Sequence, residues 1–326
     1  MTAITSQTRV RRAPANLRAF DMRRDLLAVA DLVELCFAES LDADGRLYIR
    51  QMRQTARSGR NLETLLRSSN ADLPSGGFVW QAHGNIVGNL SLVPVRSGSA
   101  RRYLIANVAV HPDYRRQGIA RALTEAALDE TRKRRADETW LQVDAANQAA
   151  QQLYLGMGFV ERAARSTWEA TPQPERAAGS QGTVSIRNQR AADWEQQQRW
   201  LERLYPEQLR WNLPLDPKLF EPGLVGSLQR LVDERRTNQW SAANGEELLG
   251  VLMWQSSSLH ADRLWLAVSE AGEAAALPAL LGHAHRNLRL KRPLALNYPA
   301  GQAAQLFEDA GFKLARNLKW MQLAAG

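Results

Sequence analysis

The chain has 326 residues, of which 44% are hydrophobic and 23% are charged. This composition is typical of a folded globular protein, excludes a wholly disordered chain or a long coiled coil, and at this length predicts two domains. Lysine and arginine together number 42 against 34 acidic residues, which gives a net charge of +8. Because most of these cations are scattered singly among acids, we expect a mildly basic surface and no nucleic-acid partner.

Cysteine content and hydropathy indicate in which cellular compartment the protein is expected. Cys36 is the single cysteine, so it can form neither an internal disulfide nor a cysteine-rich metal site. The N-terminal stretch lacks the apolar core of a signal peptide, and no run of about 18 apolar residues occurs. No spacing of His, Cys and Asp suggests a metal site. We therefore expect a cytoplasmic chain without a membrane span and without a metal cofactor.

The first half alternates between helical and strand periodicity. Apolar residues recur every three to four positions over 26–37, which predicts a helix. The β-rich runs 77–81 and 86–93 are separated by His83-Gly84-Asn85, a sequence typical of a hairpin turn. The apolar run 104–110 predicts a buried strand that stops before Pro112. Later segments predict, in order, a helix over 118–133, a strand over 139–143, a helix over 147–155 and a closing strand after Phe159.

The second half repeats the first after a linker that is rich in Pro and Gly. Three later segments match earlier ones in order: 244–252 resembles 83–90, 264–268 resembles 105–110, and 302–312 resembles 148–159. We infer a tandem duplication of one mixed α/β domain. The predicted organisation is an N-terminal arm (1–16), a first domain (17–170), the linker (171–182) and a second domain (183–326).

The segment from Val108 to Arg121 indicates an anion site. A buried strand runs through a turn into a helix that begins near Gly118, so the backbone N–H groups of residues 116–121 can face one concavity. The N-terminus of a helix favours phosphate, and arginines at 115, 116 and 121 add positive charge. The alternative is an ordinary strand, turn and helix with a surface arginine cluster.

Two motifs in this region resemble those of the GCN5-related N-acetyltransferase (GNAT) superfamily. Arg115-x-x-Gly118-x-Ala120 is similar to the loop that binds the pyrophosphate of acetyl-CoA, and the segment 140–159 follows in the family's order. The resemblance covers roughly residues 17–170. It implies a mixed α/β fold, mostly antiparallel, with one splayed parallel strand pair and helices on both faces. The implied acetyl-CoA-binding residues are Val108, Ala109, Val110, Arg115, Arg116, Gln117, Gly118, Ile119, Ala120, Arg121, Asn147 and Tyr154.

The resemblance also implies catalytic roles. Tyr154 would donate a proton to the departing CoA thiolate, which suits a phenol with a pKa of about 10. Asn147 would hydrogen-bond the pantetheine arm, and the N–H of Val108 would polarise the thioester carbonyl. Residues 108–110 would pair with the pantetheine amides as a neighbouring strand does. Taken without the resemblance, Tyr154 would be a core residue and Asn147 a helix cap.

The group that would act as general base is not specified, because Gln142 stands at the position expected for it. The first repeat is most similar to ribosomal-protein alanine N-acetyltransferases, which carry a catalytic glutamate where this chain has Gln142. An amide cannot take a proton from an ammonium group. Ordered water, Asp144, Glu34 or Glu39 are the alternatives.

The second copy lacks the chemical groups of the first. Phe307 replaces Tyr154, Ala300 replaces Asn147, and a segment with two glutamates, 269–273, replaces the phosphate loop. We therefore expect an acetyl-CoA-dependent N-acetyltransferase that acts on the primary amine of a small molecule or peptide, with an active N-terminal domain and a C-terminal pseudo-domain. A CoA-binding sensor without catalysis is the alternative. The sequence specifies neither the acceptor nor the oligomeric state.

Overall fold

A computed structural model describes residues 14–58, 76–95, 100–171, 184–223, 236–288 and 292–324. The expected N-terminal arm (1–16) and linker (171–182) lie almost wholly outside the described residues. By contacts the chain divides into a first unit, residues 1–141 with 322–326, and a second unit, residues 142–321. Each unit is described by itself.

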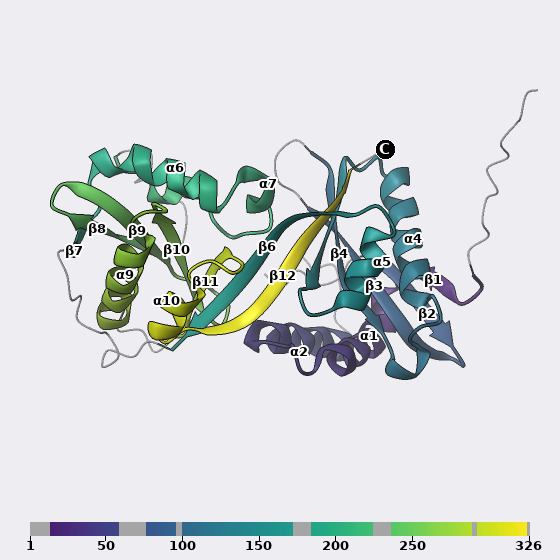
Figure 1. Ribbon diagram of the computed structural model, residues 1–326. Helices are drawn as coiled ribbons and strands as arrows, with labels where there is room; N and C mark the ends of the chain where they lie inside the picture. Colours follow the sequence, from purple (N-terminus) through teal and green to yellow (C-terminus); the bar gives the residue numbers. More distant parts are fainter. Residues whose placement is uncertain are drawn as a thin grey trace, which may run out of the picture. The chain divides into compact units, whose positions relative to one another are not determined.

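The strands of the first unit form an antiparallel series that ends in one parallel pair (Figure 1). They are β1 (Leu17–Ala19), β2 (Gly77–Ala82), β3 (Asn85–Val95), β4 (Arg102–Val110) and β5 (Glu138–Asp144), and they lie in this order. Only β4 and β5 pair in parallel, over residues 102–105 and 138–141. The predicted hairpin between β2 and β3 is confirmed, since His83 and Gly84 take the positive φ angles of 49° and 80° that such a turn needs.

Helices cover both faces of these strands. Helices α1 (Met22–Phe37) and α2 (Ala43–Arg57) begin at aspartate caps, Asp21 and Asp42, and pack with Val79 and Ala109 into one apolar core. Helix α4 (Ile119–Lys133) packs against the strands at Gly88, where a Cβ atom would lie 2.8 Å from Ile119 Cγ2. The expected fold class is confirmed for this unit.

The second unit holds further helices and strands in the same alternation. In chain order they are α5 (Gln148–Leu155), β6 (Val160–Ala170), β7 (Val184–Asn188), η3 (Ala191–Asp193), α6 (Trp194–Leu204), α7 (Glu207–Arg210), η4 (Pro217–Phe220), β8 (Thr237–Asn244), β9 (Glu247–Gln255), β10 (Asp262–Val268), α9 (Glu273–Asn287), β11 (Leu294–Pro299), α10 (Ala304–Asp309) and β12 (Lys313–Ala324). The strand order is β12-β6-β11-β10-β9-β8-β7. Strands β10 and β11 are parallel, whereas β7 to β10 and the β6–β11 pair are antiparallel.

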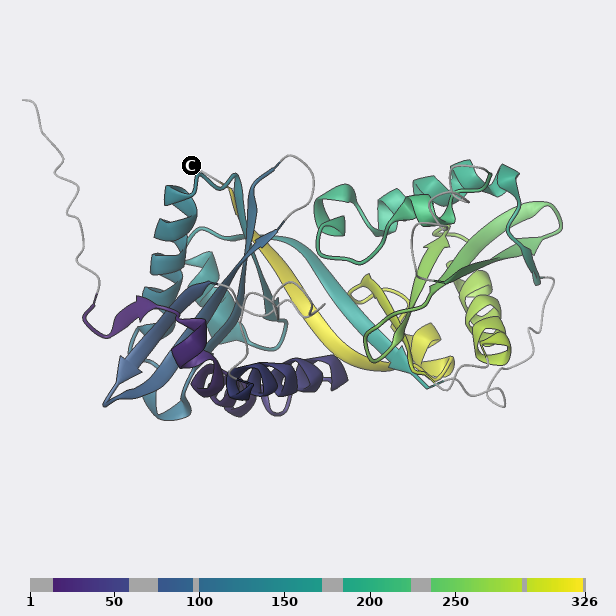
Figure 2. The same cartoon turned by 180° about the vertical axis from the view of Figure 1, so that it is seen from behind.

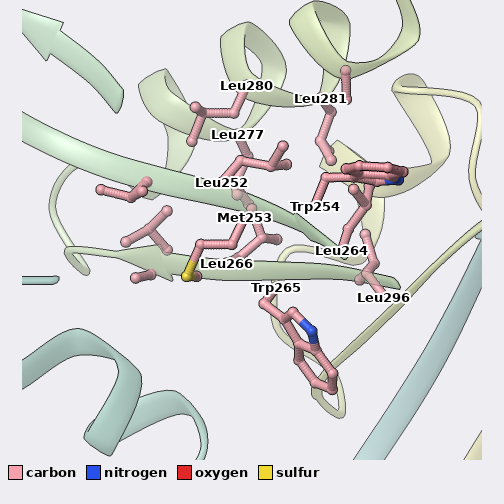
Figure 3. Close-up of a cluster of buried hydrophobic side chains, with 14 of the residues drawn as sticks. Leu252, Met253, Trp254, Leu264, Trp265, Leu266, Leu277, Leu280, Leu281 and Leu296 are labelled. Atoms are coloured by element: carbon pink, nitrogen blue, oxygen red, sulfur yellow. The ribbon is translucent and has the colours of Figure 1, made fainter. Parts of the chain in front are cut away.

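A large apolar core holds the second unit together. Figure 3 shows Leu277, Leu280 and Leu281 of α9 pointing toward the strands that carry Leu252 and Leu264. Trp265 lies on the opposite side of β10 and packs edge-on against Tyr205, just after α6. Helices therefore cover both faces of this sheet as well. Among the described residues, no helix is both long and apolar enough to cross a membrane.

Strand registers show how the two repeats correspond. Gly88 of β3 pairs with Val110 of β4, and Gly250 of β9 pairs with Val268 of β10. Gly250 is also a site of close approach, because a Cβ atom there would lie 2.6 Å from Val268 Cγ1 and 3.2 Å from Cβ of Ala276 in α9. Counting back from these pairs, Leu266 of β10 is the counterpart of Val108, the second residue before Val110.

The closing strand of each repeat pairs with strands of the other repeat. β6, which follows α5, is antiparallel to β11 from Ala170↔Leu294 to Arg165↔Pro299. β12, which follows α10, lies between β5 and β6, and the N–H of Ala145 donates to the carbonyl of Asn317 at 2.9 Å. Both views show β6 and β12 side by side (Figures 1 and 2). The second unit therefore includes residues 142–170, and the division into repeats at 17–170 and 183–326 stays a prediction from internal similarity.

Candidate active site

Strand β4 carries an irregularity three residues before its end. Asn89 of β3 pairs with Ala109, and Ser91 pairs with Ala106, so Asn107 and Val108 together lie opposite the single residue Leu90. This two-against-one arrangement is a β-bulge, which bends a strand and changes where its groups point. Asn107 has φ of 51°, in the left-handed region that few residues other than Gly, Asn and Asp adopt.

Polar side chains hold the bulge. The Nδ2 of Asn89, a residue only 1% exposed, donates to the carbonyl of Asn107 at 2.9 Å. The Nδ2 of Asn107 in turn donates to the Ser91 hydroxyl and to the Tyr48 hydroxyl of α2, each at 3.4 Å. No sequence motif marks these four residues, although Asn107 interrupts an otherwise apolar strand sequence and is a signal for this irregularity.

The predicted phosphate loop joins β4 to α4. After η1 (Pro112–Tyr114), the chain passes through Arg116 and Gly118, whose φ angles are 62° and 78°. The Nε of Arg115 donates back to the carbonyl of Val110 at 3.2 Å, and Nε2 of Gln117 donates to the carbonyl of Asp113 at 3.4 Å. Two left-handed residues separated by one position turn the chain sharply into the helix.

The start of α4 fits an anionic group. Gly118 is the N-cap of this 15-residue helix and makes no side-chain capping bond, so the first amide groups keep the unsatisfied donors that every helix start has. A Cβ atom at Gly118 would meet no other atom within 4 Å, which means that the space beside this backbone is open. Residues 115–118 and Arg121 are exposed, whereas Ile119 is buried against the core. A diphosphate could reach these amides without displacing a side chain.

Cys36 of α1 meets the same end of β4. Its thiol donates to the carbonyl of Val110 at 3.3 Å, the oxygen that also accepts from Arg115. Burial raises the pKa of the Cys36 thiol, although Arg115 opposes this effect. The side chain is half-buried.

The predicted residues of the segment 142–155 belong to the second unit. Gln142 is half-buried on β5, and Asp144 is exposed two residues later, with its Oδ1 accepting from the N–H of Ala146 at 2.7 Å. Asn147 is the N-cap of α5, and its Oδ1 accepts from the N–H of Ala150 at 3.0 Å. The structure thus shows Asn147 in a capping role, which leaves its Nδ2 as the donor that a ligand could use.

Tyr154 lies on α5 and is only 5% exposed. Burial raises the pKa of Tyr154 to about 12. Its ring packs edge-on against Phe159 with a centroid distance of 5.9 Å. The hydroxyl is therefore protonated throughout the range in which proteins are stable, and it can act as an acid but not as a base.

The two acidic candidates from the first helix differ in their surroundings. Glu34 is bound to Arg53 of α2 at 2.5 Å, and Asp31 binds the same guanidinium at 2.7 Å. These two hydrogen bonds raise the pKa of Arg53, so this cation stays charged. Glu39 follows α1 and is exposed. Among the described residues, no group of three or more His, Cys, Asp or Glu side chains is placed to hold a metal ion.

The second repeat closes the corresponding loop with its own side chains. The N–H of Gly272 donates to Ser269 Oγ at 2.9 Å, and a Cβ atom at Gly272 would lie 2.6 Å from that oxygen. Glu273 begins α9, and its carboxylate accepts from the Tyr298 hydroxyl at 2.5 Å. Burial, together with this carboxylate, raises the pKa of Tyr298. The first residue of α9 therefore carries a carboxylate, which is bound to a tyrosine of β11, whereas α4 begins after a glycine with open space beside it.

Tyr205 bridges the parallel strand pair of the second repeat. The N–H of Leu266, the counterpart of Val108, donates to the Tyr205 hydroxyl at 3.3 Å, and this hydroxyl donates to the carbonyl of Asn297 at 3.1 Å. Tyr205 is fully buried, and the guanidinium of Arg165 lies 5.1 Å from its ring centre. Nothing in the sequence pattern had marked Tyr205 or Arg165.

Comparison with known proteins agrees with this arrangement. Residues 46–159 match the acetyltransferase (GNAT) family. [Ribosomal protein bS18]-alanine N-acetyltransferase of Escherichia coli strain K12 is 48% identical over 65 residues, which are 20% of this chain and 44% of that protein. N-alpha-acetyltransferase 30 of Saccharomyces cerevisiae is 42% identical over 67 residues, 21% of this chain and 38% of that protein. The chain thus spans less than half the length of these relatives.

Two solved structures share the fold over nearly the whole chain. A GCN5-related N-acetyltransferase from Sphaerobacter thermophilus has a TM-score of 0.54 and 16% identity and covers 95% of this chain and 96% of its own. A tandem GNAT protein from the clavulanic acid biosynthesis pathway has a TM-score of 0.50 and 16% identity and covers 95% of this chain and 99% of its own. At this identity the likeness concerns the fold alone.

Proposed function

We propose that the protein is an acetyl-CoA-dependent N-acetyltransferase that transfers the acetyl group directly to a primary amine of a small molecule or peptide. The observation that carries this proposal is the open start of α4, where uncapped amides and three arginines follow a strand within a GNAT-family domain. The curated relatives are named as N-acetyltransferases of protein amines, which favours an amine acceptor.

The residues of the first repeat divide the work. Bound acetyl-CoA would supply a thioester as the acyl donor. The amides of residues 116–121 would hold its diphosphate, and the N–H of Val108 would donate to the thioester carbonyl oxygen as the amine nitrogen bonds to the carbonyl carbon. As the carbon–sulfur bond breaks, Tyr154 would give its proton to the sulfur, and Asn147 Nδ2 would hydrogen-bond the pantetheine arm.

For the amine proton we favour Asp144 among the carboxylates. Asp144 is exposed, and the N–H of Ala146 engages one of its carboxylate oxygens, whereas Glu34 is bound by Arg53. Gln142 lies two residues before Asp144 on β5, hence on the same strand face. Its amide would hydrogen-bond the acceptor amine but would not take its proton.

We assign the second repeat a structural role without cofactor. Glu273 puts a negative charge on the first turn of α9, which would repel a diphosphate there. Tyr205 takes the hydrogen bond of the strand amide that corresponds to Val108. Phe307 corresponds to Tyr154, since Phe312 N–H donates to Phe307 carbonyl as Phe159 N–H donates to Tyr154 carbonyl, and it has no hydroxyl.

Calorimetric titration of the full chain with CoA tests both parts of the proposal. We expect one site per chain, and acetyl transfer to at least one member of a panel of small amines and N-terminal peptides. Two sites per chain would refute the structural role of the second repeat. Tight binding of acetyl-CoA with no transfer to any amine would favour the sensor, and no binding would overturn the proposal as a whole.

A further inference from the structure

Helix α2 carries more net positive charge than any other α-helix that the structure describes. Its residues, Ala43–Arg57, include four arginines and one aspartate, a net charge of +3. With histidine taken as neutral, the other described α-helices, α1, α4, α5, α6, α7, α9 and α10, have net charges between −2 and 0. On those helices the basic residues are balanced or outnumbered by acidic ones. The excess of positive charge on α2 is therefore a local feature and not a property of the whole surface.

The four arginines lie on one side of α2. They recur at intervals of four, three and four residues, as Arg46, Arg50, Arg53 and Arg57. Such intervals place side chains on the same face of a helix. The buried residues of the helix, Ile49 and Met52, belong to a different face. Three of the arginines are exposed and Arg53 is partly buried, so this set, the α2 arginine stripe, is open to a partner.

One arginine of the stripe already binds carboxylates. The guanidinium of Arg53 lies 2.7 Å from Asp31 and 2.5 Å from Glu34, both on α1. By contrast, Arg50 and Arg57 form no ion pair with any residue that the structure describes. The helix thus presents two exposed guanidinium groups without a counter-ion, on either side of one that holds two carboxylates.

The stripe starts beside the end of β4. Tyr48 lies near the beginning of α2, and its hydroxyl accepts from Nδ2 of Asn107 at 3.4 Å. Asn107 directly precedes Val108, the residue whose N–H would donate to the thioester in the proposed function. From Tyr48 the helix continues for nine residues to Arg57, which is about 14 Å at a rise of about 1.5 Å per residue. An extended peptide covers this length with about four residues.

Among the described residues of the second repeat, this stripe has no counterpart. The two α-helices that follow its first strand, α6 and α7, together carry three arginines and three glutamates. On α6, Arg199 lies 3.4 Å from Glu195, and Arg203 lies 3.2 Å from Glu270. The fold therefore does not require an arginine stripe, and the stripe belongs to the repeat that holds the proposed active site.

We propose that the α2 arginine stripe binds an acidic acceptor peptide, whose N-terminal amine lies at the end of β4 and whose following residues place carboxylates against Arg50 and Arg57. This inference rests on the proposed function and narrows its acceptor to a polypeptide with acidic residues soon after the amine. Guanidinium groups bind carboxylates through several N–H donors, as Arg53 binds Asp31 through Nε and Nη2.

A peptide fits this surface better than a nucleic acid does. Asp31 and Glu34 lie beside the stripe, and their side chains are 57% and 46% exposed. They would repel a chain that carries a negative charge on every unit, because like charges at short distance repel. A peptide can place neutral residues opposite these two carboxylates and acidic residues opposite the arginines.

Acetyl transfer by the full chain to three matched peptides tests the inference. Each peptide begins with Ala-Gly, because one relative is named as an alanine N-acetyltransferase, and then carries Asp, Asn or Lys at every second position. We expect KM for the Asp peptide to be about fivefold lower than for the Asn peptide, since two exposed charge pairs contribute modestly. The Lys peptide should have the highest KM. The advantage of the Asp peptide should shrink at high salt, which screens exposed charges.

Two double variants show whether the stripe causes this preference. Arg50→Gln combined with Arg57→Gln should raise KM for the Asp peptide to that of the Asn peptide. Arg132→Gln combined with Lys133→Gln is the matched control, because it also removes two exposed cations, but from the end of α4. This control should keep the full preference for the Asp peptide.

Direct binding of the same peptides, followed by the fluorescence anisotropy of a C-terminal label, separates the inference from the proposed function. If all three peptides are acetylated with equal KM, or if the α4 control loses the preference as well, the inference is wrong although the protein is an acetyltransferase. If the Asp peptide binds through Arg50 and Arg57 but no peptide is acetylated, the proposed function fails while the binding surface stands. A single-stranded oligonucleotide that binds through these arginines more tightly than the Asp peptide would overturn the peptide as the partner.

Discussion

Arg18 of β1 binds the buried carboxylate of Asp25 through two hydrogen bonds, of 2.6 and 2.9 Å. Arg187 of β7 binds Asp193 in the same way and at the same two distances. Each pair fastens the first strand of a repeat to the beginning of its first helical segment. The arginine and the aspartate are seven positions apart in the first repeat and six in the second. Because of this difference, the sequence alone does not show that the two pairs correspond.

Asp25→Asn should lower the free energy of unfolding by about 3 kcal/mol, since it breaks a buried ion pair and leaves Arg18 without its partner. Burial alone would raise the pKa of Asp25, but hydrogen bonds from Arg18, the Asp21 amide and Arg24 outweigh it, and the pKa lies below its ordinary value of 3.8. A lowered pKa contributes stability above the unfolded-state value and loses it as pH falls through the folded-state value. Urea denaturation should therefore show a difference between wild type and variant that is full at pH 7 and shrinks below about pH 4. A difference that grew on acidification would contradict this account.

Gly118→Ala should weaken CoA binding by more than tenfold, about 1.4 kcal/mol, because the new methyl group enters the open space beside the α4 amides. Gly84→Ala is the matched control. Gly84 has nearly the same φ, 80° against 78°, and equally open surroundings, but it lies in the β2–β3 turn. Both variants should lose about 1 to 2 kcal/mol of stability in urea, and only the first should lose affinity in calorimetry. Equal affinities would remove the anion site from the start of α4.

Tyr154→Phe should lower turnover by about a hundredfold with nearly unchanged affinity for CoA, because the ring keeps its packing on Phe159 and only the proton donor is lost. With its pKa raised to about 12 by burial, the hydroxyl is protonated at every accessible pH. The ratio of wild-type to variant turnover should thus stay constant across a pH profile. A variant with full activity would exclude Tyr154 as the acid.

Tyr205→Phe should destabilise the protein by about 1 to 3 kcal/mol, since the buried N–H of Leu266 and the carbonyl of Asn297 lose their shared partner. The number of CoA sites per chain should stay at one, because Glu273 still occupies the helix start. Tyr114→Phe serves as the control, as no hydrogen bond of its hydroxyl is found within the described part of the chain. Thermal unfolding and CoA titration of both variants provide the measurement. A second CoA site in Tyr205→Phe would show that Tyr205 alone keeps the second repeat empty.

Local periodicity predicted most elements of the first repeat, because its strands are apolar and its turns carry Gly, Asn and Pro at defined positions. Helix α2 was the exception among the described helices of this repeat. Its sequence is largely polar, and only Ile49 and Met52 of its residues are buried, so no apolar stripe announces it. The pairing of β6 with β11 could not be predicted either, because the alternation of apolar and polar residues along a strand does not specify which strand lies beside it.

The candidate site divides in a similar way. The predicted phosphate loop and the proposed role of Tyr154 follow from sequence motifs in which both residue type and spacing are specified. The β4 bulge before Val108 is held instead by Asn89 and Ser91 of β3 and Tyr48 of α2, which meet only in the folded chain. Tyr205 could not be predicted, since the residues that it hydrogen-bonds, Leu266 and Asn297, are 61 and 92 positions away in the sequence.

The pairing of β6 and β12 with strands of the other repeat affects whether the second repeat can be lost during evolution. A stop codon in the linker would delete the second repeat and, with it, the strand that borders residues 142–145 and the β11 edge on which β6 depends. Each repeat thus contributes a strand that pairs with strands of the other repeat. If the second repeat holds no catalytic site, selection for the activity of the first repeat would still retain it, because the sheet of the first repeat depends on its strands.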